Sequence, residues 1–296
     1  MIIGITGGTG FIGRAVRQEA GKRGDSLVLF SRREGEGRRK FCFTEPLDVS
    51  GCEGMVHLAG ESIMGLWTRE KRRRILKSRV EGTRRLIEGI ASAAIKPRVL
   101  VSASAIGYYG DTGDRMADEE SPAGNGFLAE VTHAWEEEAV KAGGFGVRVV
   151  RLRIGMVLGR EGGAMKLIGP IFRSGLGGRI GSGRQWMSCI GVHDLAAMVL
   201  ECLHRDSVSG AMNAVMPVAV TNGEFTKAAA EAACRPAVLP VPAVALRLLL
   251  GDLSHLLLDS QRILPKRFAD IGFRYHSATV AEAMKGVFHN VALIPS

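Results

Sequence analysis

The sequence predicts a doubly wound α/β fold, in which helices cover both faces of a parallel sheet. Short runs rich in Val, Ile and Leu alternate in the first half of the chain with segments whose apolar residues recur at helical spacing. Nearly continuous apolar runs are typical of parallel strands covered on both faces, and strand–helix alternation is typical of doubly wound sheets. A glycine-rich turn also joins the first run directly to the first helical segment.

The composition is that of a folded chain with a sizeable core. The 296 residues are 46% hydrophobic and 23% charged, with a net charge of +9, and this balance argues against a disordered chain. Five cysteines without a CxxC pair argue against a disulfide framework or a Cys-based zinc site, and favour a reducing, cytoplasmic compartment. No His, Asp or Glu cluster has metal-ligand spacing, so we expect no metal, and no targeting segment is visible.

The strands and helices follow in order along the chain. Strands are expected at residues 2–6, 27–31, 55–58, 99–102 and 147–152, where the apolar runs lie. Helical spacing connects Val80 with Ala94, Leu128 with Ala139, and Leu195 with Cys202. The last of these helices is expected to run from Asp194, as its N-cap, to about Arg205, before a strand near residues 212–215 returns to the main sheet.

The pattern changes after about Leu158. Gly and Pro become frequent between Gly159 and Gly183, and Thr221 and Glu224 have the spacing of a capping box at a helix start. The apolar stretch 244–258 is too short and too charged to span a bilayer, so a buried or half-buried helix is expected there, and no membrane partner. We therefore predict that residues 1–158, rejoined by 190–216, form the sheet, and that 159–189 and 217–296 form a smaller lobe.

The glycines of residues 6–13, Thr-Gly-Gly-Thr-Gly-Phe-Ile-Gly, have the spacing of a dinucleotide-binding turn. Gly7 permits the tight turn, Gly10 removes a side chain where a pyrophosphate must approach, and Gly13 lets helix and strand pack closely. The free N–H groups and the positive end of the helix dipole then face the phosphates. A tight turn without a ligand is the alternative.

The end of the second predicted strand favours NADP(H) over NAD. A site that prefers NAD usually has Asp or Glu there, whereas this chain has Ser31, Arg32 and Arg33. Guanidinium groups bind a ribose 2′-phosphate through charge-assisted hydrogen bonds, and a carboxylate would repel it. The alternative is that both arginines are solvated loop charges.

Together these motifs resemble those of the extended short-chain dehydrogenases/reductases, and more closely an atypical, NADP-binding "epimerase family" subgroup. The resemblance runs through nearly the whole chain. Its segments are TGGTGFIG (6–13), SRR (31–33), HLAGE (57–61), SRVEGT (78–83), SASAIGYYG (102–110), LRIGMVLG (152–159) and GLGGRIGSGRQWM (175–187). The resemblance implies a Rossmann-type sheet over residues 1–158, a C-terminal substrate-binding lobe, and NADP(H) as the cofactor.

The resemblance also implies which residues contact the cofactor. The backbone of Thr9, Gly10, Phe11 and Ile12 would meet the pyrophosphate, and Ser31 and Arg32 would face the adenosine phosphate. Three groups complete the set: Leu58, Ala59 and Gly60 along the adenine-ribose end, Arg79 near the cofactor, and Ile154 and Gly155 beside the nicotinamide.

The catalytic pair that the resemblance leads us to expect, Tyr-x-x-x-Lys, is absent. In that pair the Lys and the cofactor lower the pKa of the Tyr, which then transfers a proton. Here the Tyr position reads Phe127 and the Lys position Val131. Ser104 matches the substrate-orienting Ser, and Tyr108 is the candidate proton donor. Tyr109 is a further candidate nearby, and the alternative for both tyrosines is that they pack at a strand end.

Glu61, Gln185 and Trp186 are the candidate substrate-binding residues. Nucleotide-sugar epimerases usually grip a diphosphate with an Arg after this Gly-rich segment, but Met187 stands at that position here. We therefore expect a small carbonyl or hydroxyl compound that is uncharged or weakly anionic.

Seven Lys and Arg residues crowd the helical segment from Arg69 to Arg79, opposed only by Glu70. Such a run can attract nucleic acid or an anionic membrane. No interleaved aromatic residues accompany it, so a solvated helix is favoured and a nucleic-acid partner is disfavoured.

The expected function is an NADP(H)-dependent oxidoreductase or epimerase-like enzyme with a small-molecule substrate. The rival interpretation is a regulatory NADP(H)-binding protein with little or no turnover, which the resemblance links to cell division. The sequence leaves homo-oligomer formation open.

Overall fold

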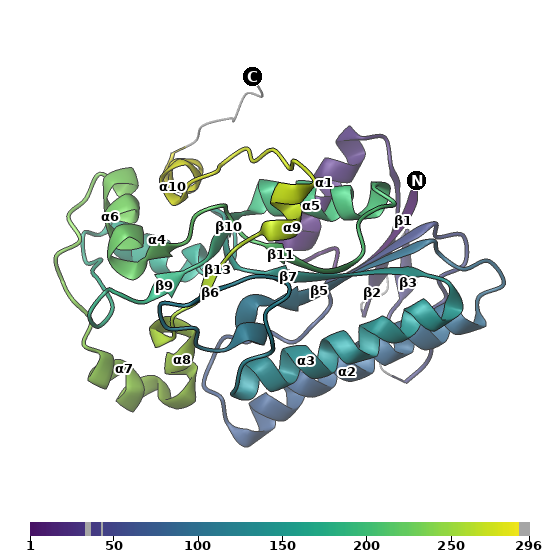
Figure 1. Cartoon of the computed structure of the whole chain (residues 1–296), viewed down its shortest axis with the longest axis horizontal. Coiled ribbons are helices and arrows are strands. Elements are labelled where there is room, and N and C mark those ends of the chain that lie inside the picture. Colours follow the sequence, from purple (N-terminus) through teal and green to yellow (C-terminus); the bar gives the residue numbers. More distant parts are fainter. Residues whose placement is uncertain (33–36, 43, 290–296) are drawn as a thin grey trace.

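The computed structural model describes residues 1–32, 37–42 and 44–289. At its centre lies a parallel sheet, drawn edge-on in Figure 1. Across the sheet the strands are β11 (Gly210–Ala214), β7 (Arg148–Ile154), β5 (Val99–Ala105), β4 (Gly54–His57), β1 (Ile2–Thr6), β2 (Ser26–Ser31) and β3 (Arg38–Lys40). The five strands expected in the first half are confirmed, as is the returning strand, which pairs with β7. Strand β3 was not foreseen.

Two pairs of helices cover the sheet, one on each face (Figure 1). Helices α1 (Phe11–Lys22) and α5 (Val192–His204) pack together on one face, and α2 (Arg69–Ser92) and α3 (Phe127–Val140) on the other. The doubly wound fold is therefore confirmed. The expected N-cap of α5 is wrong, because the cap is Gly191 and Asp194 lies in the first turn. The buried Asp194 carboxylate instead accepts hydrogen bonds from the backbone N–H groups of His276 and Ser277.

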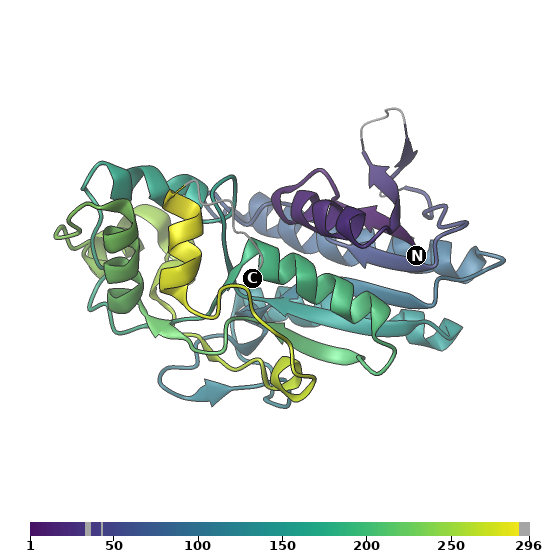
Figure 2. The same cartoon turned by 90° about the horizontal axis from the view of Figure 1, so that it is seen from above.

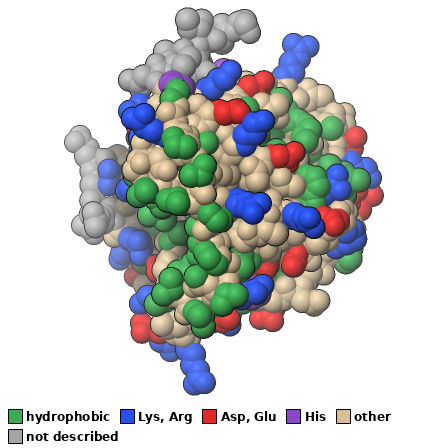
Figure 3. Space-filling model, turned by 90° about the vertical axis from the view of Figure 1, so that its left-hand side faces the viewer, with side chains coloured by type: hydrophobic (Ala, Val, Ile, Leu, Met, Phe, Trp, Pro, Cys, Tyr) green, Lys and Arg blue, Asp and Glu red, His purple; other side chains and the backbone are tan. Residues whose placement is uncertain are grey.

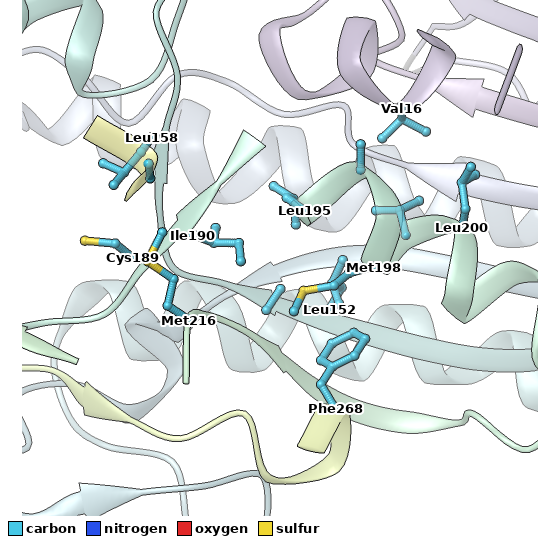
Figure 4. Close-up of a cluster of buried hydrophobic side chains, with 14 of the residues drawn as sticks. Val16, Leu152, Leu158, Cys189, Ile190, Leu195, Met198, Leu200, Met216 and Phe268 are labelled. Carbon is cyan, nitrogen blue, oxygen red and sulfur yellow. The ribbon is translucent and has the colours of Figure 1, made fainter. Parts of the chain in front are cut away.

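The largest core cluster lies between the sheet and the α1–α5 layer. Figure 4 shows Val16 of α1 and Leu195, Met198 and Leu200 of α5 above Leu152 of β7, all of them buried. Burial of such side chains contributes roughly 1.5–3 kcal/mol each. This packing holds the strand ends in place, and the residues that follow those ends form the candidate site.

The remaining elements are short. They are β6 (Met116–Ala117), β8 (Met156–Leu158), β9 (Trp186–Met187), β10 (Cys189–Gly191), β12 (Val220–Thr221), β13 (Arg262–Ile263), α4 (Met165–Arg173), α6 (Asn222–Ala233), α7 (Ala243–Leu250), α8 (His255–Leu258), α9 (Lys266–Asp270), α10 (Val280–Phe288), and the 3-10 helices η1 (Ile106–Tyr109), η2 (Lys141–Phe145) and η3 (Gly251–Ser254). Figure 2 shows α4, α6 and α10 grouped beside the sheet. We call α4, α6, α7 and the loops 174–185 and 234–242 the outer lobe. The capping box of α6 is confirmed, because Thr221 Oγ1 accepts from the N–H of Glu224, whose carboxylate accepts from the N–H of Thr221.

The apolar stretch 244–258 does not form the single buried or half-buried helix expected from its composition. Helix α7 ends at Leu250, and Gly251, with a φ of 53°, turns the chain into η3 and then α8. An ion pair between Arg72 of α2 and Asp252 of η3 connects the chain after this turn to α2. The inner face of α7 is half-buried, but Leu248 on its outer face is 82% exposed. Among the described residues, the helices are too short or too polar to cross a membrane.

Candidate dinucleotide-binding site

The glycine turn between β1 and α1 has closed sides and an open mouth. Gly7 has a φ of 72°, and a Cβ atom there would lie 2.9 Å from the backbone of Leu58 and Ala59. A Cβ at Gly13 would lie only 2.3 Å from the Gly7 carbonyl oxygen. A Cβ at Gly10 would meet nothing within 4 Å except that carbonyl oxygen, at 3.2 Å. The first and third glycines therefore let backbone segments pack closely together, and the second leaves space above the start of the helix.

Gly10 is also the N-cap of α1, and no side chain caps this helix. The first N–H groups of a helix lack partners within it, and together with the helix dipole they favour an anion. The open space at Gly10 and the uncapped helix end fit the pyrophosphate of a dinucleotide. Thr9 precedes Gly10, and Phe11 and Ile12 are the first two residues of α1, so the residues predicted to meet the pyrophosphate belong to this turn and helix start.

A buried contact between neighbouring strands fixes the next loop beside the glycine turn. Thr6 Oγ1, at the end of β1, lies 2.7 Å from Nδ1 of His57 at the end of β4 and accepts a hydrogen bond from the N–H of Ala59. Burial lowers the pKa of His57 to about 4, so its imidazole is neutral at pH 7. Sequence reasoning did not assign a role to His57, although it opens the HLAGE segment.

Arg79 supports this loop from behind. Its Nη1 donates to the carbonyl oxygens of Glu61, at 3.0 Å, and Ile75, and its guanidinium lies flat against Gly60 and over the Trp135 ring. Burial lowers the pKa of Arg79 to about 10. The predicted cofactor residues Leu58, Ala59 and Gly60 therefore lie in a segment held between Thr6 and Arg79.

The β2 end brings Arg32 close to the same loop. Strands β1 and β2 are neighbours, and Arg32 follows β2 as an exposed side chain. The pKa of Glu61 is lowered, first by its hydrogen bond to Lys71 and also by the charges of Lys71, Arg74 and Arg32. Ser31 is the last residue of β2, and Arg33 lies outside the described residues.

At the other end of the predicted site, Ile154 ends β7 and Gly155 follows it. A Cβ atom at Gly155 would lie 2.5 Å from the carbonyl oxygen of Ser188. The ring of Phe11 packs into the loop after β8, because Cβ atoms at Gly159 and Gly162 would lie 2.5 and 2.2 Å from it. Sequence reasoning noted the Gly-rich composition there but did not connect it with Phe11, since the contact is between distant segments.

Ser104 lies in a buried ion network. Its hydroxyl donates to Glu136 Oε1 at 2.7 Å, and Arg153 holds both carboxylate oxygens of Glu136 at 2.8 and 2.9 Å. Arg151 adds a third cationic contact, at 3.2 Å. Although burial lowers it, the pKa of Arg153 is raised by its bond to Glu136. These contacts commit the Ser104 proton to a carboxylate.

The network continues to the two tyrosines. Arg153 Nη1 donates to the Tyr109 hydroxyl, which donates to Asn213 Oδ1, and burial raises the pKa of Tyr109 to about 12. The Arg153 guanidinium lies 3.4 Å from the centre of the Tyr108 ring, which stacks on His133. Tyr108 lines a hollow of about 370 Å³ that also contacts α3. Arg153 thus contacts the Tyr108 ring directly and is linked to Ser104 only through Glu136.

The positions of the missing Tyr and Lys are filled by apolar packing. Phe127 starts α3 and contacts Trp67 edge-on and Arg72, and Val131 is buried. A Cβ atom at Gly107 would lie 3.2 Å from Cβ of Leu128, so η1 is the segment that meets the first turn of α3. Ser104 contacts α3 at Glu136, more than two turns further along.

The three candidate substrate residues already have protein partners. Lys71 Nζ lies 2.8 Å from Glu61, and the Gln185 amide donates to the carbonyl oxygens of Ile180 and Leu257. The Trp186 indole donates to Asp114, and Arg262 lies over its ring. The contacts of Gln185 and Trp186 connect this loop to Asp114, Leu257 and Arg262.

The basic face of α2 is partly neutralised by carboxylates. Lys71 and Arg74 meet Glu61, Arg72 meets Asp252, and Lys77 meets Glu81. Two of these partners lie outside the helix, so the sequence alone could not show them. Within the part of the chain that the structure describes, no group of His, Cys, Asp or Glu side chains is arranged to hold a metal.

Comparisons with known proteins agree with this geometry. The model of the NAD dependent epimerase/dehydratase family matches residues 3–214, and a domain of unknown function, DUF1731, matches 241–287. The chain is 36% identical to the chloroplastic SDR39U1 homolog of Arabidopsis thaliana, an epimerase family protein, over 97% of this chain and 86% of that one. It is 35% identical to the epimerase family protein YfhF of Bacillus subtilis, over 93% and 94% of the two chains.

Solved structures show the same likeness. The human epimerase family protein SDR39U1 (isoform 2), crystallised with NADPH, superposes with a TM-score of 0.93 at 34% identity, covering 98% of this chain and 100% of that one. A nucleoside-diphosphate sugar epimerase from Corynebacterium glutamicum superposes with a TM-score of 0.81 at 30% identity, covering 98% of this chain and 58% of that one. The chain therefore belongs to the NAD-dependent epimerase/dehydratase family.

Proposed function

We propose that this protein is an NADP(H)-dependent oxidoreductase or epimerase-like enzyme acting on a small carbonyl or hydroxyl compound. The observation that carries the proposal is the glycine turn, which is closed at Gly7 and Gly13 and open at Gly10 above an uncapped helix. The human relative of 34% identity was crystallised with NADPH, which supports the same cofactor here.

Preference for NADP(H) rests on Arg32. Its side chain is exposed beside the loop that carries Glu61, and it forms no ion pair with any residue that the structure describes. A 2′-phosphate adds an anion that a guanidinium can bind through charge-assisted hydrogen bonds. Lys71 and Arg74 form ion pairs with the Glu61 carboxylate. The paired carboxylate repels the 2′-phosphate less strongly.

When bound, the cofactor would supply hydride transfer at its nicotinamide ring. The N–H groups at the start of α1 would hold the pyrophosphate, Arg32 the 2′-phosphate, and the segment between Thr6 and Arg79 the adenine-ribose end. The Tyr108 hydroxyl has no hydrogen bond to the described parts of the chain, so it stays available as a proton donor. The Ser104 hydroxyl can accept a hydrogen bond, but it already donates its own proton to the Glu136 carboxylate.

A second candidate function is that of a regulatory protein that binds NADP(H) without turnover. The Ser104–Glu136 bond and the apolar packing of Phe127 and Val131 favour it, because these contacts use the catalytic positions for stability. Turnover distinguishes the two candidates.

The first experiment is a calorimetric titration of the full chain with NADPH and NADH. Arg32→Ala is expected to weaken NADPH binding by about 1.5–3 kcal/mol and to leave NADH binding nearly unchanged. The control is Arg274→Ala, since Arg274 is also exposed and forms no ion pair with the described residues. Equal losses for both cofactors would contradict the assignment of Arg32.

The second experiment measures NADPH oxidation against a panel of small aldehydes and ketones. Turnover that falls at least tenfold in Tyr108→Phe would support the enzyme, with Tyr108 as proton donor. Tight NADPH binding without turnover on any member of the panel would support the regulatory candidate.

A further inference from the structure

A groove on the outer lobe lies apart from the cofactor site. It runs between α6, the turn 177–183 and the segment 237–240, and encloses about 510 Å³. That volume lies within the range of ordinary small-molecule pockets. All of its lining residues follow residue 158, so the glycine turn and the strand ends of the sheet do not contribute to it. Figure 3 looks onto this end of the molecule, where apolar side chains gather and Lys and Arg side chains lie among them.

The polar side of the α6 groove is cationic. Arg179 and Lys227 line it, and none of the lining residues is acidic. Arg179 is exposed, and its side chain forms no ion pair or hydrogen bond with the described residues. Lys227 has one long contact with a carboxylate, 3.9 Å to Glu231 one turn along the helix, where both side chains are well exposed. An exposed ion pair of this kind is weak, so Lys227 as well as Arg179 is available to bind an anion.

Thr226 gives the groove a hydroxyl without a partner. Thr226 precedes Lys227 on α6, its side chain lines the groove, and the residue is only 6% exposed. Thr132, in the middle of α3, donates to the carbonyl oxygen of Leu128 four residues earlier, which is the usual solution in a helix. Thr226 makes no such bond to any described residue. The hydroxyl oxygen reaches solvent in the groove rather than being sealed in the core, so a ligand in the groove can bond to it.

The other side chains of the groove are apolar, and hydrogen bonds connect the segments that carry them. Ala230, Val238 and Pro240 line it, and Val238 is largely exposed. The Asn222 side chain accepts from the N–H of Ile180 at 2.7 Å, and the N–H of Val241 donates to the Arg179 carbonyl oxygen at 2.9 Å. These bonds join α6, the turn 177–183 and the chain around residues 237–241, so protein contacts hold the three walls of the groove together.

We propose that the α6 groove binds a small amphipathic anion, with a carboxylate or phosphate head at Arg179, Lys227 and Thr226 and an apolar body along Ala230, Val238 and Pro240. The two cations supply charge complementarity, and the hydroxyl supplies a directional hydrogen bond. The apolar wall favours a ligand with a hydrocarbon portion over a bare anion. The site is separate from the cofactor site and does not depend on the proposed function.

The test uses octanoate and octyl phosphate as probes in calorimetric titrations of the full chain. Saturable binding of one molecule per chain is expected for at least one of them, and the stronger of the two identifies the head group. Octanol, which lacks the charge, and acetate, which lacks the apolar body, are expected to bind at least tenfold more weakly. Octanol or acetate binding as tightly as the probes would overturn the proposal, and so would the absence of saturation with both probes.

Variants locate the binding. Arg179→Gln combined with Lys227→Gln is expected to weaken binding at least tenfold, and Ala230→Trp to block it by filling the groove. Lys166→Gln is the matched control, because Lys166 is an exposed lysine on α4 outside the groove. Thr226→Val keeps the shape of the side chain and tests the hydroxyl, with a loss of at least threefold expected. Binding that is unchanged in the double variant and in Ala230→Trp would overturn the proposal.

Gly10→Ala separates this site from the cofactor site. Probe binding is expected to persist in Gly10→Ala and in the presence of saturating NADPH. If NADPH competes with the probe, the anion is bound at the cofactor site and the proposal is wrong.

Discussion

The strand ends of one sheet carry two regions with opposite character. Between β1 and α1 the turn is built from glycines, which have no side chains. The space at Gly10 therefore leaves the N–H groups at the start of α1 open. At β5 and β7 the side chains bind one another. Ser104 and Arg153 both contact the buried Glu136 carboxylate of α3, and the Arg153 and Glu136 charges are paired. The difference shows that one sheet edge combines two ways of building a region, one with the backbone and the other with side chains that bind one another. Four measurements test whether the two regions differ in this way.

The largest effect is expected for Glu136→Ala. Removing this carboxylate leaves the Arg153 guanidinium buried without its counter-charge, which typically costs about 3–5 kcal/mol. Urea unfolding followed by circular dichroism measures the loss in free energy of unfolding. Glu137→Ala is the control, since the neighbouring Glu137 carboxylate is exposed, and it should cost less than about 0.5 kcal/mol. Equal costs for the two variants would show that the network is not the stabilising element.

The next largest effect is expected in the pH dependence of the free energy of unfolding, through His57. Burial lowers the pKa of His57 from 6.5 to about 4, so the unfolded chain binds a proton at a higher pH than the folded chain. This contribution to stability is present above pH 6.5 and is lost as the pH falls toward 4, by up to about 3 kcal/mol.

Unfolding measured between pH 4 and pH 7 tests this expectation. His57→Asn keeps a polar group near Thr6 but cannot titrate, so its stability should fall less steeply over that range. An identical pH dependence in both proteins would mean that other groups control acid unfolding.

A smaller effect, confined to the cofactor, is expected for Gly10→Ala. The added methyl group points into the open mouth of the turn and should weaken NADPH binding at least tenfold, or about 1.4 kcal/mol. The free energy of unfolding should change by less than about 1 kcal/mol, because the methyl group meets only the Gly7 carbonyl oxygen.

Gly13→Ala is the contrasting variant for the same measurements. Its methyl group would lie 2.3 Å from that carbonyl oxygen, so it should lower both cofactor binding and stability. Similar stability losses in the two variants would contradict the open mouth at Gly10.

The smallest effect is expected for Ser104→Ala. Loss of its hydrogen bond to Glu136 should cost about 1 kcal/mol of unfolding free energy, while Arg153 still pairs with the carboxylate. NADPH affinity should stay the same, since the hydroxyl points into the network. Ser102→Ala is the control, because Ser102 makes only a long contact, 3.4 Å, with a carbonyl oxygen. A large loss of NADPH affinity in Ser104→Ala would place this residue in the cofactor site instead.

Most of the fold was predictable because its signals are local. Apolar runs identified the strands, and the capping box at Thr221 identified the start of α6. Local signals failed where tertiary contacts competed with them. Asp194 has the chemistry of an N-cap, yet its carboxylate binds the backbone at 276–277. The stretch 244–258 has the composition of a core helix, yet a glycine turn and the Arg72–Asp252 pair break it and leave leucines in solvent.

Residue types at fixed spacing are enough to predict the alternation of strands and helices, the glycine turn, and the absence of Tyr and Lys at positions 127 and 131. The folded chain is needed to see that Ser104 bonds to Glu136, that Arg79 supports the loop behind Gly60, and that two cations and a hydroxyl line one groove of the outer lobe. These contacts join residues far apart in the chain, and their partners are chosen by packing and burial, which residue spacing does not encode.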